Sequence, residues 1–415
     1  MTAPTPAPPG APPPARVRLP DVVRRYLVAI AVSRFGTGLT LPFTLILLHE
    51  VRGIDLPTVG LLLALPGVVG LLAVPFSGSL VDRVGPRTVL RVCLVLQAVG
   101  TTGTVLAHTP GQALVPLLLT GLGLGPSFPA SNALLTGLVD DQALAGRAFG
   151  VQFTVINAAL GVGTLVAAAV VDVHRPSTFV ALYLTCAATC FVEWLLLPPA
   201  AARVVAHDDH PPSYGEVLRD PVFRQVCLIS LLLAMTGYAA LDSGLPAYAR
   251  VEGGVSPSTI ALSYTVNTVL IVSLQLPVLR WIASWRRTRA LAVAAVLWAA
   301  SWALLGLAHS AVAVLVFSAL FGLGEVFQAP AMQPLVNALS TDRLRGRYNA
   351  LSGSMFSIAF VVSPALSGFL IGNGLGTLWI SGLTAGSLLT ALLALRLRRR
   401  LSSQQDGVPV AAQVV

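Results

Sequence analysis

Twelve apolar segments follow one another along this 415-residue chain, and short polar connections separate them. Each segment is close to the ~20 residues that a helix needs to cross the ~30 Å hydrocarbon layer of a bilayer. Closed barrels also span membranes, but their strands are runs of about ten alternating residues, unlike these continuous apolar runs. The sequence therefore predicts an all-α membrane protein with 12 transmembrane helices, at 22–48, 57–80, 88–107, 113–138, 148–171, 178–197, 223–247, 258–279, 290–308, 311–337, 348–371 and 377–395.

The composition points to the same class of protein. Hydrophobic residues make up 55% of the chain and charged residues only 10%, and the mean hydropathy is +0.80. A soluble protein carries about 25% charged residues, so this chain has too few polar side chains to cover a surface in water. The cysteines lie in apolar runs without CxxC spacing, so we expect small buried hydrophobes rather than a disulfide or a metal site. They are Cys93, Cys186, Cys190 and Cys227.

The placement of the basic residues predicts the orientation in the membrane. All 26 are arginines, and the formal net charge is +9. With the amino terminus in the cytoplasm, only Arg52, Arg175 and Arg250 lie in outer connections. Because cytoplasmic loops carry the excess of arginine, we expect a multi-pass protein of the cell membrane with both termini in the cytoplasm. The basic charge then reflects topology, and no nucleic acid is expected as a partner.

The chain divides into two similar halves. The longest polar connection follows the sixth segment, and the halves resemble each other at an offset near 200, with Gly146-Arg147 matching Gly346-Arg347 and Pro75 matching Pro277. Two six-helix halves related by duplication are an architecture of secondary transporters, whose substrate site lies between the halves. A passive membrane scaffold is the alternative. The expected parts are a disordered Pro/Ala-rich tail 1–20, bundles 21–197 and 223–395, a cytoplasmic linker 198–222 and a cytoplasmic tail 396–415.

A loop motif follows the second segment and reads Gly78-Ser-Leu-Val-Asp82-Arg83-Val-Gly85-Pro-Arg87. It resembles the signature G-x-L-x-D-R-x-G-R-R/K of the major facilitator superfamily. The resemblance implies that Gly78 lets adjacent helices approach closely, and that Asp82 bonds an opposing helix end and Arg83 or another arginine as a latch of the cytoplasmic gate. Gly85 and Arg87 would shape the turn and its charge. An ordinary solvated turn is the alternative.

The second half carries a degraded copy of this motif. Arginines persist between Arg280 and Arg289, but Ala283 or Ser284 stands where the first half has Asp82. We therefore expect an asymmetric latch. A D…G-R element recurs in both halves and ends in Arg147 and Arg347, which suggests paired gate contacts.

Four ionisable residues lie within the apolar segments, where a charge costs about 3 kcal/mol on insertion scales and is a functional candidate by default. In the family that this chain resembles, helices 1, 4, 7 and 10 line the central cavity. The resemblance therefore puts Arg34, Asp242 and Glu325 on cavity helices. Glu193, near the inner end of segment six, is expected to extend to the membrane interface instead.

Glu325 is the strongest of these candidates. It shares one helical face with Gln328, and a low dielectric favours its protonated form, so that it can load and release protons during alternating access. The alternative is a satisfied buried acceptor. Arg34 is either a counter-ion, an anchor for an anionic substrate or a packing residue. Asp242 is either a second titrating site or a residue of the cavity mouth. The amides of Asn132, Asn157 and Asn267 either bond substrate or join helices.

The tenth-segment G-x-x-E…P pattern makes the chain most similar to twelve-helix multidrug-efflux members of the superfamily, which are drug:proton antiporters. Those members carry G-x-x-x-G-P-x-x-G-G in helix five, whereas this chain reads Gly161-Val-Gly163-Thr-Leu-Val-Ala. They also carry an arginine at the start of helix four, where Leu117 to Thr120 has none. These departures leave the coupling mechanism open.

We therefore expect a secondary active transporter, most simply a proton-coupled exporter of amphipathic small molecules or drugs. An uptake permease or facilitator for a small polar solute is the alternative. Neither nucleotide-binding nor catalytic motifs are visible, so we expect no enzyme, no metal and no cofactor, with the proton gradient as energy source. The expected partners are the lipid bilayer, a small-molecule substrate and protons, and the expected state is a monomer.

Overall fold

The computed structural model describes residues 19–139, 142–199, 214–308, 310–340 and 344–408, and within these ranges the chain is helical without strands. Residues 1–18 of the expected tail and 200–213 of the expected linker lie outside the described residues. The helices are α1 (Asp21–Thr40), η1 (Leu41–Phe43), α2 (Thr44–Ile46), η2 (Leu47–Val51), α3 (Leu56–Val84), α4 (Pro86–Leu106), α5 (Pro110–Gly137), α6 (Gln142–Val170), α7 (Pro176–Leu196), α8 (Tyr214–Arg219), α9 (Pro221–Thr236), α10 (Tyr238–Val251), α11 (Pro257–Trp281), α12 (Arg287–Leu307), α13 (Ala311–Leu339), α14 (Arg345–Gly372), α15 (Gly376–Leu397) and η3 (Arg398–Arg400).

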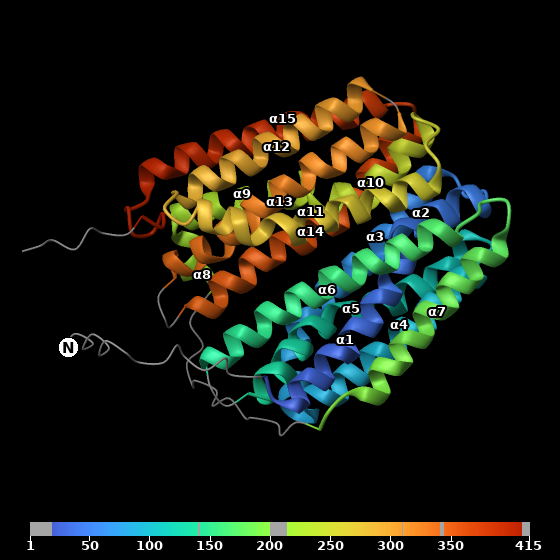
Figure 1. The fold of residues 1–415 in the computed structure, drawn as a ribbon, viewed down its shortest axis with the longest axis horizontal. Coiled ribbons are helices and arrows are strands. Elements are labelled where there is room, and N and C mark those ends of the chain that lie inside the picture. Colours follow the sequence, from blue (N-terminus) through green and yellow to red (C-terminus); the bar gives the residue numbers. More distant parts are fainter. Residues whose placement is uncertain (1–18, 140–141, 200–213, 309, 341–343, 409–415) are drawn as a thin grey trace, which may run out of the picture.

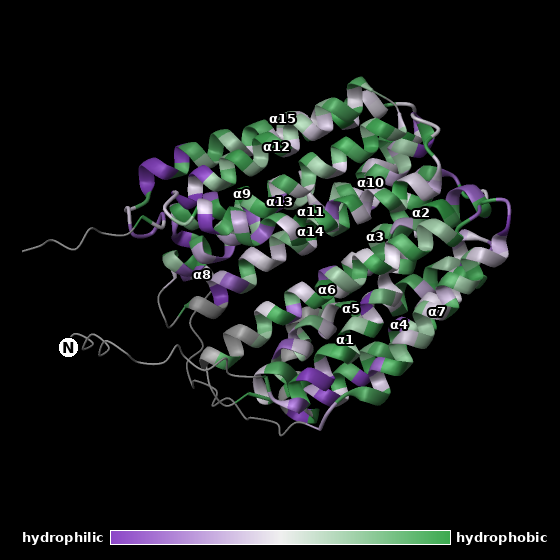
Figure 2. Cartoon of the chain, viewed as in Figure 1, coloured by the Kyte–Doolittle hydropathy of each residue, from purple (hydrophilic) through white to green (hydrophobic). Residues whose placement is uncertain are grey.

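Twelve helical stretches of the described chain are long and apolar enough to cross a membrane. Figure 2 shows hydrophobic residues along the middle of the helices and hydrophilic residues gathered at both ends of the molecule. A hydrophobic belt between two polar ends matches a bilayer with water on both sides. The chain is a multi-pass membrane protein, and the predicted fold class is confirmed.

Polar caps and early prolines begin several of these helices. Asp55 precedes α3 and accepts a hydrogen bond from the backbone N–H of Thr58 (2.9 Å). Ser256 precedes α11 and accepts one from the N–H of Thr259 (3.2 Å). Such caps satisfy backbone donors that a helix start leaves free, and proline in the first turn lacks the N–H altogether. These helix starts therefore leave fewer backbone N–H groups without a partner.

The first and seventh spans are interrupted, although the hydropathy predicts continuous helices over 22–48 and 223–247. The span Asp21–Val51 changes from α1 to the turn η1, which contains Pro42, while the span Pro221–Val251 breaks at Gly237 (φ −103°, ψ −110°). At the second break the Trp302 indole Nε1 donates a hydrogen bond to the freed carbonyl of Thr236 (2.6 Å). Satisfying that carbonyl from a neighbouring helix makes a break within a membrane tolerable.

Two bundles lie side by side in Figure 1, one formed by α1 to α7 and the other by α9 to α15. The bundles meet mainly through α3 against α14 and α6 against α11. Glycines allow the first of these contacts, because a methyl group at Gly60 would lie 2.9 Å from the Cα of Gly368. Between α6 and α11, the hydroxyls of Thr164 and Thr265 are 3.3 Å apart.

These contacts lie toward one end of the molecule, where α3 begins and α14 ends. We call it the Glu50 end, because Glu50 lies there, and the opposite end, where α12 begins, the Asp406 end. In Figure 1 the two bundles approach each other near α2 and α10 and diverge toward the end at which α8 lies. The halves are thus packed together at the Glu50 end.

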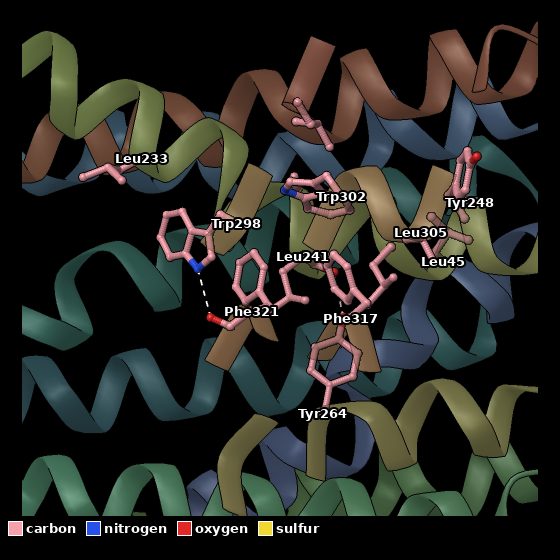
Figure 3. Packing of buried hydrophobic residues seen from close by; sticks show 14 of the residues in the cluster. Leu45, Leu233, Leu241, Tyr248, Tyr264, Trp298, Trp302, Leu305, Phe317 and Phe321 are labelled. Atoms are coloured by element: carbon pink, nitrogen blue, oxygen red, sulfur yellow. Dashed lines mark hydrogen bonds between the residues drawn. The ribbon is translucent and has the colours of Figure 1, made fainter. Parts of the chain in front are cut away.

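An aromatic core fills the second bundle. The rings of Trp298 and Phe321 stack with centroids 4.9 Å apart, and the Trp298 Nε1 donates a hydrogen bond to the Phe321 carbonyl (3.0 Å; Figure 3). Trp302 contacts Phe317 from the same side (4.6 Å). Gly324 permits this packing, since a methyl group there would lie 2.5 Å from the Trp298 Nε1. The core thus fixes α13 directly beside Glu325.

Candidate transport site

The carboxyl group of Glu325 lies inside the second bundle and has a neutral partner. Glu325 on α13 is only 8% exposed, and its Oε2 accepts a hydrogen bond from the Asn267 Nδ2 on α11 (2.6 Å). Gly322 lets the two helices come this close, because a methyl group at Gly322 would lie 3.0 Å from that Nδ2. The structure therefore brings together two of the residues that the sequence singled out separately.

Gln328 lies one turn further along α13 and bonds to the start of α10. The Tyr238 hydroxyl donates to the Gln328 Oε1 (2.9 Å), and Tyr238 is the first residue after the break at Gly237. The Tyr238 ring lies 5.3 Å from that of Phe356, which stacks on Phe360 at 4.9 Å. Three aromatic rings thus extend from α10 along α14, beginning beside the Glu325 helix.

Asp242 lies one turn after Tyr238 on α10 and is half-buried. Its carboxylate has no hydrogen-bond or ion-pair partner among the described residues, and it lies within electrostatic reach of Glu325 and Tyr264. The Tyr264 hydroxyl donates to the Leu241 carbonyl (2.8 Å) and so ties α11 to α10 beside this carboxylate. Two acidic groups therefore share one region of the second bundle, and two of their polar neighbours, Asn267 and Tyr264, are neutral.

An open groove of about 390 Å³ runs along α11, the helix that carries Asn267. Four of its six lining side chains are aliphatic, and Thr265, which contacts Thr164 of the first half, marks the side that faces the other bundle. An apolar groove with a few polar groups suits an organic ligand. Its lining residues are Thr265, Val266, Val269, Leu270, Ser273 and Leu274.

The expectation for Glu193 is wrong. Its side chain does not extend to the membrane interface but is buried (3% exposed), facing Ser33 and Arg34 of α1. The Glu193 Oε2 and the Arg34 Nε are buried without a hydrogen-bond partner among the described residues. The side of α7 that carries Glu193 packs on α1, where Gly36 leaves room for Thr189. Hydropathy gives a residue's depth but not the direction in which it points.

Arg34 is therefore placed with Glu193 and not with the second-half acids. The groups that interact with it electrostatically are Tyr26, Cys186, Cys190 and Glu193, all from the first half. The four cysteines are buried, as expected.

The two remaining amides lie apart from Glu325. The Asn157 Nδ2 donates to the Phe153 carbonyl of its own helix (2.8 Å). Asn132 is half-buried on α5, and among the described residues neither amide hydrogen-bonds to the Glu325 group.

Only part of the expected gate motif falls within the described side chains. Those of Gly78, Asp82 and Arg147 lie outside, so the Asp82 latch stays a prediction. Gly85 joins α3 to α4 with φ +83°, a conformation that glycine adopts without strain. Arg83 is exposed beside this turn. Arg87 is half-buried at the start of α4, and Arg347 is half-buried at the start of α14.

An ion pair between the halves escaped the sequence analysis. Arg250 at the end of α10 donates from Nε to the Glu50 Oε1 (2.5 Å) and pairs with the second carboxylate oxygen as well. The Arg250 Nη1 also donates to the Val255 carbonyl (2.7 Å). A signal was present, because Glu50 and Arg250 are 200 positions apart, which is the offset of the repeat. Opposite charges at repeat-related positions are candidates for a contact across the pseudo-symmetry axis.

Comparison with known proteins gives one family. The model of the Major Facilitator Superfamily matches residues 26–256 and 251–413. An uncharacterized MFS-type transporter, YqjV of Bacillus subtilis (strain 168), is 22% identical over 354 residues, 83% of this chain and 85% of that protein. The multidrug resistance protein MdtH of Enterobacter sp. (strain 638) is 26% identical over 307 residues, which cover 72% of this chain and 74% of that protein.

Solved structures share the fold at low sequence identity. The nucleoside transporter NupG superposes with a TM-score of 0.72 at 11% identity, covering 92% of this chain and 99% of that one. A D-xylose–proton symporter superposes with a TM-score of 0.72 at 13% identity, covering 94% and 99%. These two neighbours carry different solutes, so the likeness extends to the architecture and not to the substrate.

Proposed function

The chain belongs to the major facilitator superfamily and is a membrane transporter, and we propose that it exports amphipathic small molecules in exchange for protons by alternating access. The observation that carries this proposal is the buried carboxyl of Glu325, whose hydrogen-bond partner is the neutral amide of Asn267. No cation has to lose its partner when this carboxyl takes up a proton. Burial of an isolated carboxylate is costly, which favours proton uptake when the site is dry.

The surroundings of Glu325 support an amphipathic substrate. The rings of Tyr238, Phe356 and Phe360 offer an aromatic wall beside α13, and the α11 groove offers aliphatic side chains. Aromatic rings bind flat apolar groups by stacking and attract cations over their faces. The similarity to MdtH, named as a multidrug resistance protein, points in the same direction.

The arginine distribution supports an orientation in which the Asp406 end faces the cytoplasm of a bacterial cell and both termini lie there. The packed Glu50 end would then face outward, so that this arrangement opens toward the cytoplasm. No cofactor is part of the proposal, because the proton gradient supplies the energy. We propose a monomer as the working unit.

Transport in vesicles tests the proposal. Purified protein is reconstituted with an imposed pH gradient, and uptake of ethidium, a neutral lipophilic dye and D-xylose is compared. We expect gradient-driven ethidium transport, and for Glu325→Gln a loss of at least about tenfold in the gradient-driven rate, while ethidium exchange without a gradient continues. Glu252→Gln removes an exposed carboxyl at the end of α10 and is the matched control.

Two results would count against this function. If the rate of ethidium transport by the wild-type protein does not depend on the pH gradient, the protein is a facilitator and not a proton exchanger. If only D-xylose moves, the uptake permease becomes the better description.

A further inference from the structure

The segment after α15 turns back and packs against the start of α12. Asp406 is fully buried, and its carboxylate accepts hydrogen bonds from the Thr288 backbone N–H and from the Thr288 hydroxyl, both at 2.9 Å. The Arg286 Nη1 lies 3.5 Å from the same carboxylate. A carboxylate at a helix amino terminus satisfies free backbone donors and interacts favourably with the helix dipole.

Arg287 extends the contact to a third element. Its backbone N–H donates to the Asp406 carbonyl (2.8 Å), and its Nη1 donates both to the Gln405 carbonyl (2.9 Å) and to the Pro334 carbonyl on α13 (3.1 Å). Gly407, with φ +85°, turns the chain directly against the Arg287 side chain. The Arg287 side chain thus joins the start of α12 directly to the last two turns of α13, and the carboxy-terminal segment holds that side chain through the Gln405 carbonyl.

The Asp406 carboxylate lies at the loop between α11 and α12, which lacks the acidic residue of the first-half motif. The loop between α11 and α12 is the degraded second copy of the gate motif, with Ala283 or Ser284 where the first half has Asp82. Asp406 brings a carboxylate to the end of this loop from 118 positions away along the chain. One arginine that the degraded copy retains, Arg286, therefore still has an acidic partner.

We propose that Asp406 is a positioning residue for transport, which replaces the lost loop acid, caps the start of α12 and so holds Arg287 in place as a clip between α12 and the end of α13. The clip supports the observed arrangement, in which the halves are packed at the Glu50 end. Because α13 carries Glu325 nine residues before Pro334, the clip sets the position of the helix that bears the site. The inference rests on membership of a transporter family and does not depend on which solute or ion is carried.

The test uses the full chain and needs no substrate. Val269→Cys places a thiol in the α11 groove, where Val269 is 58% exposed, and the native cysteines are buried. In this background Asp406→Asn keeps the side-chain shape but removes the charge. We expect maleimide labelling at position 269 to slow at least about threefold, because a state that loses a contact becomes less populated. We also expect amide hydrogen exchange in 335–339 to accelerate at least about tenfold.

A rescue distinguishes positioning from a merely structural cap. Adding Ser284→Asp to Asp406→Asn returns an acid to the loop itself, and we expect labelling within twofold of the parent. Ser403→Ala, in an exposed position of the same turn, is the matched control. Arg286→Gln removes the Arg286–Asp406 ion pair and keeps the hydrogen bonds from Thr288 to Asp406. This variant replaces Asp406→Asn in the experiment if Asp406→Asn does not fold. An unchanged labelling rate in folded Asp406→Asn would overturn the proposal, and so would a slowed rate that Ser284→Asp does not restore. Both outcomes are independent of the result of the transport experiment in vesicles.

Discussion

The two halves share one fold but treat their buried acids differently. In the first half, Glu193 on α7 faces Arg34 on α1, so a carboxyl and a guanidinium lie within electrostatic reach. In the second half, Glu325 bonds to the neutral Asn267, and Asp242 has no ionic partner among the described residues.

The difference separates an acid that faces an arginine from an acid whose hydrogen-bond partner is neutral, and the proposed proton exchange needs the second kind. Protonating Glu193 would leave Arg34 without its compensating charge, which is costly in a low dielectric. Protonating Glu325 leaves no charge behind. Within the described part of the chain, the second half therefore carries the acids that suit the proposed proton exchange, because their protonation leaves no arginine uncompensated.

The largest expected effect concerns the first-half pair. Glu193→Leu leaves the Arg34 guanidinium without an acid and should lower the free energy of unfolding by about 3 kcal/mol. Thermal denaturation of the purified protein in detergent measures it. The double variant Arg34→Met with Glu193→Leu removes both charges and should recover most of the loss. A double variant no more stable than the single one would show that the charges are not coupled.

The next effect concerns the neutral partner in the second half. Asn267→Leu removes the amide that donates to the Glu325 carboxyl and should cost about 1–3 kcal/mol of stability, since a buried acceptor is left unsatisfied. The same substitution in a Glu325→Gln background should cost less, and the difference is the coupling between the two side chains. Equal costs in both backgrounds would mean that the hydrogen bond adds nothing to stability.

A smaller effect is expected for the ion pair that crosses between the halves. Glu50 and Arg250 keep side-chain exposures of 20% each, so Glu50→Gln should destabilise by about 1 kcal/mol, and less at high salt. Exchanging the two residues, with Glu50→Arg and Arg250→Glu together, should restore part of the loss. Melting temperatures at low and high salt measure both. A loss that does not change with salt would contradict an electrostatic role.

The smallest effect is the sharpest test of the comparison. Glu325→Gln should change stability by about 0.5 kcal/mol or less, because no cation loses its partner and an amide can still accept from Asn267. The measurement is the same thermal denaturation used for Glu193→Leu. If both substitutions destabilise the protein equally, the two halves do not differ in the way described.

Several candidate site residues could be found from the sequence because they are charged residues within apolar segments. Glu325 and Asp242 are charges within apolar segments, and such exceptions stand out without knowledge of any contact. Glu193 stood out for the same reason but was assigned to the wrong surroundings. Its depth in the segment was available from the sequence, whereas the side of α7 that packs on α1 was not.

Other partners became visible only in three dimensions. Asp406 lies in a polar carboxy-terminal segment with no motif, and its contact with Thr288 joins residues 118 positions apart. The break at Gly237 was also hidden, because glycine occurs in continuous membrane helices as well. What makes that break tolerable is the indole of Trp302 on a different helix.

The sequence by itself determined the number of spans and indicated two halves, because hydropathy, length and repetition are properties of the chain read locally, and the resemblance of the loop after the second span indicated the family. The tertiary structure decided which side chains face one another. A helix that is apolar on all sides has no polar face to set its rotation, so only the packing of small residues such as Gly322 and Gly36 against their neighbours fixes where Glu325 and Glu193 point.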